Sequence, residues 1–151
     1  MIRTLNKKEC EKVLATNYIG NLSYIFKDRP FIVPITYFYN QDDNVIIGYS
    51  AEGHKINAMR KNDNVSFSVS DVDSINSWES VLARGSFKEL IGSYAKAQLH
   101  AFSLGVKDLI MKKEHKKLDF ISEFSAKLYT EDLPIVFHIL VEEITGKIRR
   151  H

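Results

Sequence analysis

The residues from Ser50 to Lys55 have the types and spacing of an anion-binding turn. Residues 45–49 are rich in β-branched and aromatic side chains and predict a strand, whereas the chain from His54 onward has helical spacing. A strand that turns into a helix beside Gly53 leaves free N–H groups at the helix start, where the helix dipole favours negative charge. Ser50, His54 and Lys55 can add donors and positive charge, so this turn predicts a phosphate site.

The same residues allow a second interpretation. Ser50 could act as a helix cap, and Lys55 could be an ordinary solvated lysine. The sequence of the turn leaves both interpretations open.

Other residues that could carry chemistry stand apart from one another. The five histidines, which show no metal-ligand spacing, are His54, His100, His115, His138 and His151. His138 lies in an apolar stretch and is interpreted as a core or interface histidine with a hydrogen-bond partner. The single cysteine, Cys10, excludes an internal disulfide and predicts a packing role in a reducing compartment.

Composition is typical of one globular domain spanning residues 1–151. Hydrophobic residues make up 44% of the chain, and the net charge is only +2, which does not indicate a nucleic-acid or membrane partner. The longest apolar runs fall short of the roughly 20 residues that a membrane span needs. The N-terminal residues lack the apolar segment of a signal peptide. We therefore expect a cytoplasmic protein.

Alternation with period two predicts mainly antiparallel strands in the first ninety residues, followed by helices and a late strand. The expected strands are residues 18–26, 31–40, 45–49, 65–72, 78–90 and 134–148. The expected helices are residues 6–15, 53–61, a segment after Gly92, and 116–127. A long run of strands with one late return suits a closed or nearly closed antiparallel barrel.

Three details of these strands are predicted as well. Pro34 cannot donate to a strand ladder, so it should lie at an edge, at a bulge or beside a ligand. A polar loop is expected over residues 71–77, and a bend at Gly85. Residues 135–141 are continuously apolar apart from His138 and should be buried on both faces of the sheet.

Three segments in this order resemble the pyridoxamine-5′-phosphate-oxidase-like split barrels that bind FMN: RPFIVPITYFYN, IIGYSAEGHKINAMRKNDNVSFSV and WESVLARGSF. The branch that the chain resembles is that of the short proteins related to nitroimidazole-resistance flavoproteins, which end in a strand similar to VEEITGK. The resemblance covers nearly the whole chain and is weakest over residues 93–131. It implies a mainly β fold, a split antiparallel β-barrel with a few peripheral helices.

The resemblance implies how this chain would hold the FMN phosphate and ribityl chain. Ser50, His54 and Lys55 match the positions that hold the phosphate, which agrees with the interpretation of the turn as an anion site. Tyr49 would flank the ribityl chain.

The resemblance also implies how the isoalloxazine ring would lie. It would lie along the backbone of four consecutive strand residues, Val33, Pro34, Ile35 and Thr36. Ser80 and Val81 would reach the flavin from the partner subunit. These barrels are usually dimers with two FMN sites at the interface, so a homodimer is implied.

Two departures from the family pattern narrow the expected activity. Pyridoxamine phosphate oxidases carry an Arg–Lys pair near the phosphate-facing strand, and this chain has Ile32 and Tyr37 there. These oxidases also carry an arginine-rich C-terminal motif, and this chain ends in EEITGKIRRH instead. In the nitroimidazole branch a histidine often precedes the serine of the turn, where this chain has Tyr49. Neither specific activity is supported by these residues.

The sequence therefore predicts an FMN-dependent oxidoreductase that acts on a small, aromatic organic substrate. No residue stands out as a required acid or base, which is compatible with electron or hydride transfer directly at the flavin. The alternative is a barrel that holds flavin or haem without turnover, with His138 or His100 as an iron ligand.

Overall fold

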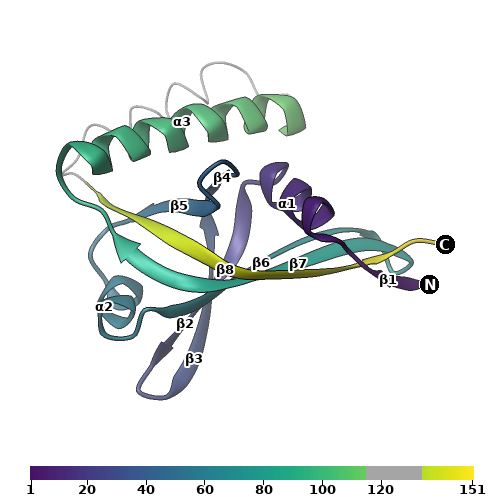
Figure 1. Ribbon diagram of the computed structural model, residues 1–151, viewed down its shortest axis with the longest axis horizontal. Helices are drawn as coiled ribbons and strands as arrows, with labels where there is room; N and C mark the ends of the chain where they lie inside the picture. Colours follow the sequence, from purple (N-terminus) through teal and green to yellow (C-terminus); the bar gives the residue numbers. More distant parts are fainter. Residues whose placement is uncertain (115–133) are drawn as a thin grey trace.

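A computed structural model describes residues 1–114 and 134–151 of the chain (Figure 1). The described elements, in chain order, are β1 (Ile2–Thr4), α1 (Lys7–Ala15), β2 (Ile19–Phe26), β3 (Arg29–Thr36), β4 (Phe38–Asn40), β5 (Val45–Ser50), α2 (His54–Lys61), β6 (Asn64–Ser74), β7 (Ser77–Glu89), α3 (Gly92–Glu114) and β8 (Ile135–Arg149). The helix expected over residues 116–127 lies outside the described residues. None of the described helices is long and apolar enough to cross a membrane.

The strands form one antiparallel sheet in the order β3-β2-β6-β7-β8-β5-β4, and β1 pairs with the far end of β8. The two edge strands, β3 and β4, are separated in the chain by Tyr37 alone. Both edges must therefore meet at this residue, so the sheet curls into the predicted split barrel without closing its ladder. Tyr37 is fully buried, and its N–H donates to the carbonyl of Tyr18 at 2.8 Å.

The prediction of one strand over residues 31–40 is wrong, because the chain is divided at Tyr37 into β3 and β4. Tyr37 is also anchored by its hydroxyl, which donates to the carbonyl of Leu14 at 2.8 Å. Its side chain thus belongs to the barrel interior, whereas the backbone on either side of it belongs to opposite edges of the sheet.

Apolar side chains divide between the two faces of the sheet. Inside the barrel the core includes Leu22, Ile46 and Phe67, and it is closed at one end by α1. On the outer face, Val45 and Ile47 pack with residues of α3, which lies across β5 in Figure 1. Because alternate residues of β5 point to opposite faces, this strand is buried on both sides.

The hairpin of β6 and β7 differs from its prediction. The polar loop expected over residues 71–77 is wrong: β6 continues to Ser74 and β7 begins at Ser77. The polar residues lie on a projecting hairpin arm, residues 71–80, which extends beyond the barrel toward the two chain termini (Figure 1). Residues 71–76 are exposed, so the alternation of apolar and polar residues that marks a half-buried strand is absent there.

The predicted bend at Gly85 is confirmed. Arg84 pairs with Glu143 but Gly85 pairs with Val141, so Glu142 forms a bulge in β8. A Cβ atom at Gly85 would lie 1.9 Å from the carbonyl oxygen of Leu140, which explains the glycine. The prediction that residues 135–141 are buried on both faces is wrong at Leu140, which is 38% exposed beside this bulge.

Candidate functional site

The turn between β5 and α2, residues 50–55, presents an open helix N-terminus. Gly53 is the N-cap residue of α2 and supplies no side-chain cap, and the first backbone bond into the helix is donated by Asn57 to the carbonyl of Gly53. A Cβ atom at Gly53 would meet no atom within 4 Å. Ser50 instead donates its hydroxyl to the carbonyl of Ala51 at 2.8 Å, so the interpretation of Ser50 as a cap is wrong.

His54, the first residue of α2, is held by the hairpin of β2 and β3. The hydroxyl of Tyr24 lies 2.9 Å from its Nδ1. The rings of Phe26 and Phe31 lie with their centroids 4.8 and 4.9 Å from the imidazole, and Tyr24 stacks on Phe31 at 5.5 Å. Nε2 has no partner within residues 1–114 and 134–151, so it is available to a ligand beside the helix start.

Charge in the β5–α2 turn is arranged in favour of an anion. Lys55 is half-buried and makes no hydrogen bond or ion pair with any part of the chain that the structure describes. Glu52, the acidic residue of the turn, is held by Arg60 through two bonds of 2.9 Å. Arg60 also contacts Glu89 at 2.7 Å, and hydrogen bonds to Glu89 and Glu52 raise its pKa. The negative charge of Glu52 is therefore paired, whereas the positive charge of Lys55 is not.

The four residues predicted along the flavin ring occupy the open edge of the sheet. β3 pairs with β2 on one side and has no neighbouring strand on the other among the described residues. Pro34, which pairs with Asn21, is exposed at this edge, as predicted for a proline inside a strand. Val33, Ile35 and Thr36 are half-buried. The edge leaves backbone donors and acceptors that a planar ligand could use.

The side chain of Tyr49 is directed away from the β5–α2 turn. Its ring packs edge-on against Phe102 of α3, with centroids 5.2 Å apart, and burial raises its pKa. Ser50 follows directly in β5 and therefore points to the opposite face. The structure thus brings Ser50, His54 and Lys55 together in one turn and places the Tyr49 ring against α3; its position beside a ribityl chain stays a prediction.

Ser80 and Val81 lie in β7, far along the sheet from the β5–α2 turn. Ser50 is opposite Ile135 at the start of β8, whereas Ser80 is opposite Lys147 near its end. The side chain of Val81 is fully buried in the barrel core. Contact of Ser80 with a flavin bound at the turn would therefore need a second copy of the chain, whereas Val81 has no exposed surface and its contact with a flavin stays a prediction.

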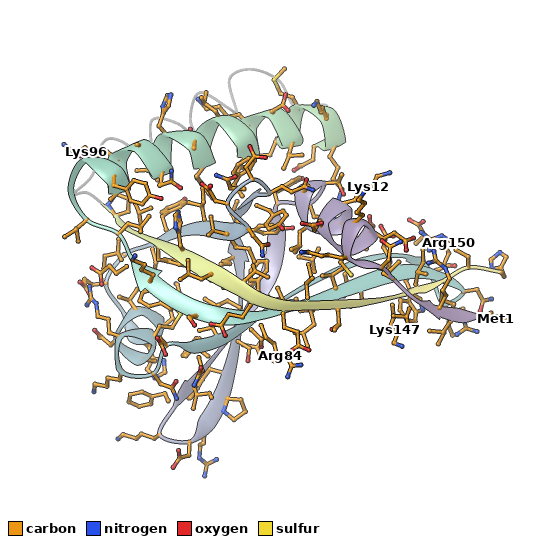
Figure 2. All side chains as sticks on the ribbon, viewed as in Figure 1. Met1, Lys12, Arg84, Lys96, Lys147 and Arg150 are labelled. Carbon is orange, nitrogen blue, oxygen red and sulfur yellow. The ribbon has the colours of Figure 1, made fainter. Side chains whose placement is uncertain are left out.

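Ser80 lines an outer groove on β7, β8 and β1 that is open to such a partner. The groove has a volume of 430 Å³, and its lining residues are Thr4, Trp78, Ser80, Leu82, Thr145, Gly146 and Lys147. Figure 2 shows Lys147 and Arg150 near Met1, at the end of the sheet where the termini meet. The ammonium group of Lys147 donates to the Thr4 hydroxyl at 2.8 Å, which ties β1 to β8 along this groove.

The sequence did not identify the aromatic residues around His54 or the role of Arg60. The aromatic residues are Tyr24, Phe26 and Phe31, and the available signal was the alternation that places Tyr24 and Phe26 on one face of their strand. The ion pairs of Arg60 join three separate elements, so spacing along the chain gives no signal for them.

His138 is confirmed as a core histidine with a partner. It is 4% exposed, and its Nε2 lies 2.7 Å from Oε1 of Gln98. Burial lowers its pKa. Cys10 is likewise buried in the core, as predicted. Within the described ranges, no three His, Cys, Asp or Glu side chains are grouped so that they could hold a metal ion.

Comparison with known proteins identifies the family. The profile of the family described as pyridoxamine 5′-phosphate oxidase matches residues 6–147. The chain belongs to this family. An uncharacterized protein of Rhizobium meliloti is 33% identical over 105 residues, which are 68% of this chain and 68% of its own.

Solved structures agree with the family assignment. An FAD-binding protein from Mesorhizobium loti is 27% identical, with a TM-score of 0.76 over 100% of this chain and 98% of its own. A proposed 5-nitroimidazole antibiotic resistance protein from Bacteroides thetaiotaomicron is 21% identical, with a TM-score of 0.63 over 98% of this chain and 89% of its own. The expected pyridoxamine 5′-phosphate oxidase family and its split-barrel fold are thereby confirmed.

Proposed function

We propose that this member of the pyridoxamine 5′-phosphate oxidase family binds the riboflavin 5′-phosphate unit of FMN and is an FMN-dependent oxidoreductase. The observation that carries the proposal is Lys55, an unpaired cation in the first turn of α2 among the described residues, beside backbone amides that no side chain caps. A phosphate group would supply the missing negative charge and accept from the free amides. The FAD-binding protein from Mesorhizobium loti supports a flavin as the group attached to that phosphate.

The remaining site residues fit a flavin that extends from the turn. Nε2 of His54 and the hydroxyl of Ser50 would add polar contacts to the phosphate, and the open edge of β3 from Val33 to Thr36 would meet the polar edge of the ring. Phe31 and Ile32 are 37% and 69% exposed on β3 and would contact an aromatic substrate. Such a substrate would lie over the ring, and the flavin supplies the electron transfer when bound.

A homodimer would complete this site. Ser80 and Val81 lie too far along the sheet to reach the turn of their own subunit, and the groove around Ser80 contains the exposed apolar side chain of Leu82 and the half-buried Trp78. A symmetric pair of chains would bury this surface and bring Ser80 of each chain to the site of the other.

The binding part of the proposal is tested by titrating purified protein with FMN. We expect quenching of flavin fluorescence and a shifted flavin band near about 450 nm. Unchanged spectra would show that the flavin proposal is wrong. Haem added in parallel tests the alternative of a haem-binding barrel, which the hydrogen bond between His138 and Gln98 does not favour.

The catalytic part is tested without knowledge of the electron donor. FMN-loaded protein is reduced with dithionite under anaerobic conditions and mixed with a panel of quinones and nitroaromatic compounds, with reoxidation followed at the flavin band. We expect at least one acceptor to reoxidise the protein-bound flavin faster than it reoxidises free FMN at the same concentration. Binding without any such acceleration would identify a flavin-binding protein that does not turn over these acceptors.

A further inference from the structure

His54 is an exposed residue, yet its imidazole ring is held by three aromatic side chains of the β2–β3 hairpin. The ring centroid lies 4.8 Å from that of Phe26, 4.9 Å from that of Phe31 and 5.7 Å from that of Tyr24. The hydroxyl of Tyr24 also lies 2.9 Å from Nδ1. The imidazole has therefore given up rotamer freedom before any ligand arrives, which lowers the entropic cost of a contact made by its other nitrogen.

Tyr24, the one hydrogen-bonding residue of these three, is itself fixed in the sheet. Its side chain is 4% exposed and stacks on the ring of Phe31 at 5.5 Å, with an angle of 8° between the two planes. Its backbone pairs with Phe31 of β3 on one side and with Val65 of β6 on the other. The Tyr24 hydroxyl therefore approaches His54 from a rigid part of the barrel.

The direction of the hydrogen bond between Tyr24 and His54 follows from where each group can donate. A buried hydroxyl almost always donates its hydrogen to an acceptor. Among the described residues, Nδ1 of His54 is the one partner of the Tyr24 hydroxyl. If Nδ1 carried the hydrogen, the hydroxyl hydrogen would have no acceptor in this part of the chain. Tyr24 is therefore the donor, and Nδ1 is the acceptor.

This direction determines what the other nitrogen of His54 can do. A neutral imidazole carries one hydrogen, so an acceptor at Nδ1 places that hydrogen on Nε2. Nε2 has no partner within residues 1–114 and 134–151, and it lies at the start of α2 beside Lys55. As a donor it suits a phosphate oxygen without needing a charged imidazolium. The opposite tautomer would present a lone pair to the phosphate and repel it.

We infer that Tyr24 is a positioning residue of the phosphate site. By donating to Nδ1 it fixes both the tautomer and the orientation of His54, so that Nε2–H is ready to donate to the phosphate of the flavin nucleotide. The phosphate contact rests on the function proposed above, whereas the tautomer of His54 does not depend on a ligand. Tyr24 does not contact the phosphate itself, and its effect on binding acts through His54.

The first test measures the tautomer directly, by ¹⁵N NMR of the histidine side chains in the purified full-length protein without flavin. The spectra are recorded at about pH 8, where histidine side chains are mainly neutral. The signals of His54 are identified by their absence in His54→Ala. We expect an unprotonated Nδ1 and a protonated Nε2. A hydrogen on Nδ1 in the unmodified protein would overturn the inference.

Tyr24→Phe keeps the stacked ring and removes only the hydroxyl, so the ¹⁵N shifts of His54 should move toward the average of the two tautomers. The matched control is Tyr39→Phe, which also removes the hydroxyl of a buried tyrosine. Tyr39 is 3% exposed, and its hydroxyl donates to Oδ1 of Asn44 at 2.7 Å. This control should leave the His54 signals unchanged. Unchanged signals in Tyr24→Phe as well would show that the hydroxyl does not set the tautomer.

The second test compares FMN with riboflavin, which lacks the phosphate, by fluorescence quenching. Tyr24→Phe should weaken FMN binding by about two- to tenfold, the effect of one hydrogen bond, and leave riboflavin binding unchanged. In the His54→Ala background, Tyr24→Phe should have no further effect on FMN, because the two residues act as a unit. Equal losses for FMN and riboflavin, or the same loss in both backgrounds, would show that Tyr24 acts only on the fold.

Failure of this inference and failure of the proposed function give different results. If Lys55→Ala weakens FMN binding but Tyr24→Phe does not, the phosphate site stands and the positioning role of Tyr24 is wrong. If the unmodified protein binds neither FMN nor riboflavin, the proposed function is wrong and the role of Tyr24 in phosphate binding is wrong with it.

Discussion

Arg60 binds Glu52 through two parallel hydrogen bonds of 2.9 Å, and its Nε binds Glu89 at 2.7 Å. One guanidinium group thereby joins the turn before α2, α2 itself and the end of β7. Ion pairs exposed to this degree contribute little to stability. Their effect is on local charge, since Arg60 neutralises the acidic residue of a turn in which Lys55 has no charged partner among the described residues.

Arg60→Ala should therefore weaken FMN binding without unfolding the protein. The freed carboxylate of Glu52 would repel a phosphate at the turn, and one charge near a helix N-terminus changes affinity by about two- to fivefold. The double variant Glu52→Gln/Arg60→Ala should restore the affinity. If the double variant binds FMN as weakly as Arg60→Ala, the effect of Arg60 does not act through Glu52.

Lys55→Ala should weaken FMN binding by about ten- to a hundredfold, because a charge-assisted contact to a phosphate contributes about 1.5–3 kcal/mol. Riboflavin, which lacks the phosphate, should bind equally well to both proteins. Lys8→Ala is the matched control, because Lys8 occupies the same second position of α1 as Lys55 does of α2. Equal losses for FMN and riboflavin would place Lys55 near the ring and contradict the phosphate assignment.

Leu82→Asp should convert the proposed dimer to a monomer, measured by sedimentation velocity. Leu82 is 40% exposed and lines the groove around Ser80, so a carboxylate there would be buried in the interface. Leu104→Asp, at a residue of α3 that is 54% exposed, is the control and should leave the mass unchanged. A monomeric unmodified protein would contradict the dimer.

Gly85→Ala should destabilise the protein by about 3 kcal/mol or more, measured by urea unfolding. The added Cβ would lie 1.9 Å from the Leu140 carbonyl oxygen, which belongs to the neighbouring strand and cannot rotate away. Gly53→Ala is the comparison, since its Cβ meets no atom within 4 Å and should cost at most about 1 kcal/mol as an N-cap replacement. Similar losses for both variants would show that β7 and β8 separate easily at the bulge.

The stability of the protein should fall as the pH falls below 6.5, in part because of His138. Burial lowers the pKa of this histidine in the folded protein below its ordinary value of 6.5, so the unfolded chain binds the proton first. The free energy of unfolding should therefore decrease from pH 7.5 to pH 5.5, and less so in His138→Gln. His151→Gln changes an exposed histidine and should show the same pH dependence as the unmodified protein. If the unmodified protein, His138→Gln and His151→Gln all lose stability equally between pH 7.5 and pH 5.5, His138 does not contribute to the pH dependence.

Local signals in the sequence predicted most elements of the fold and the centre of the candidate site. The alternation in β2 and β6 depends on residues close together in the chain, and the bend at Gly85 depends on a single residue. The β5–α2 turn was predicted for the same reason, because its donors and its charge lie within six consecutive residues.

The features that were missed depend on partners distant in the chain. The aromatic contacts of His54 come from β2 and β3, and the ion pair of Glu52 is formed by Arg60 near the end of α2. The periodicity of apolar and polar residues along the sequence does not indicate such contacts. The arm over residues 71–80 is exposed, and without a buried face its sequence looks like a loop. The division of β3 from β4 at Tyr37 reflects the curling of the sheet into a split barrel, which is a property of the whole sheet.

The central position of β8 has a consequence for how this protein is made. β8 pairs with β7, β5 and β1, and it is translated after every one of them. While the polypeptide is still being synthesised, β5 and β7 each lack a neighbour, and their unpaired edges are open to association with other nascent chains. The sheet can become one cooperative unit only once β8 has left the ribosome, so formation of the native barrel depends on contacts between distant parts of the chain.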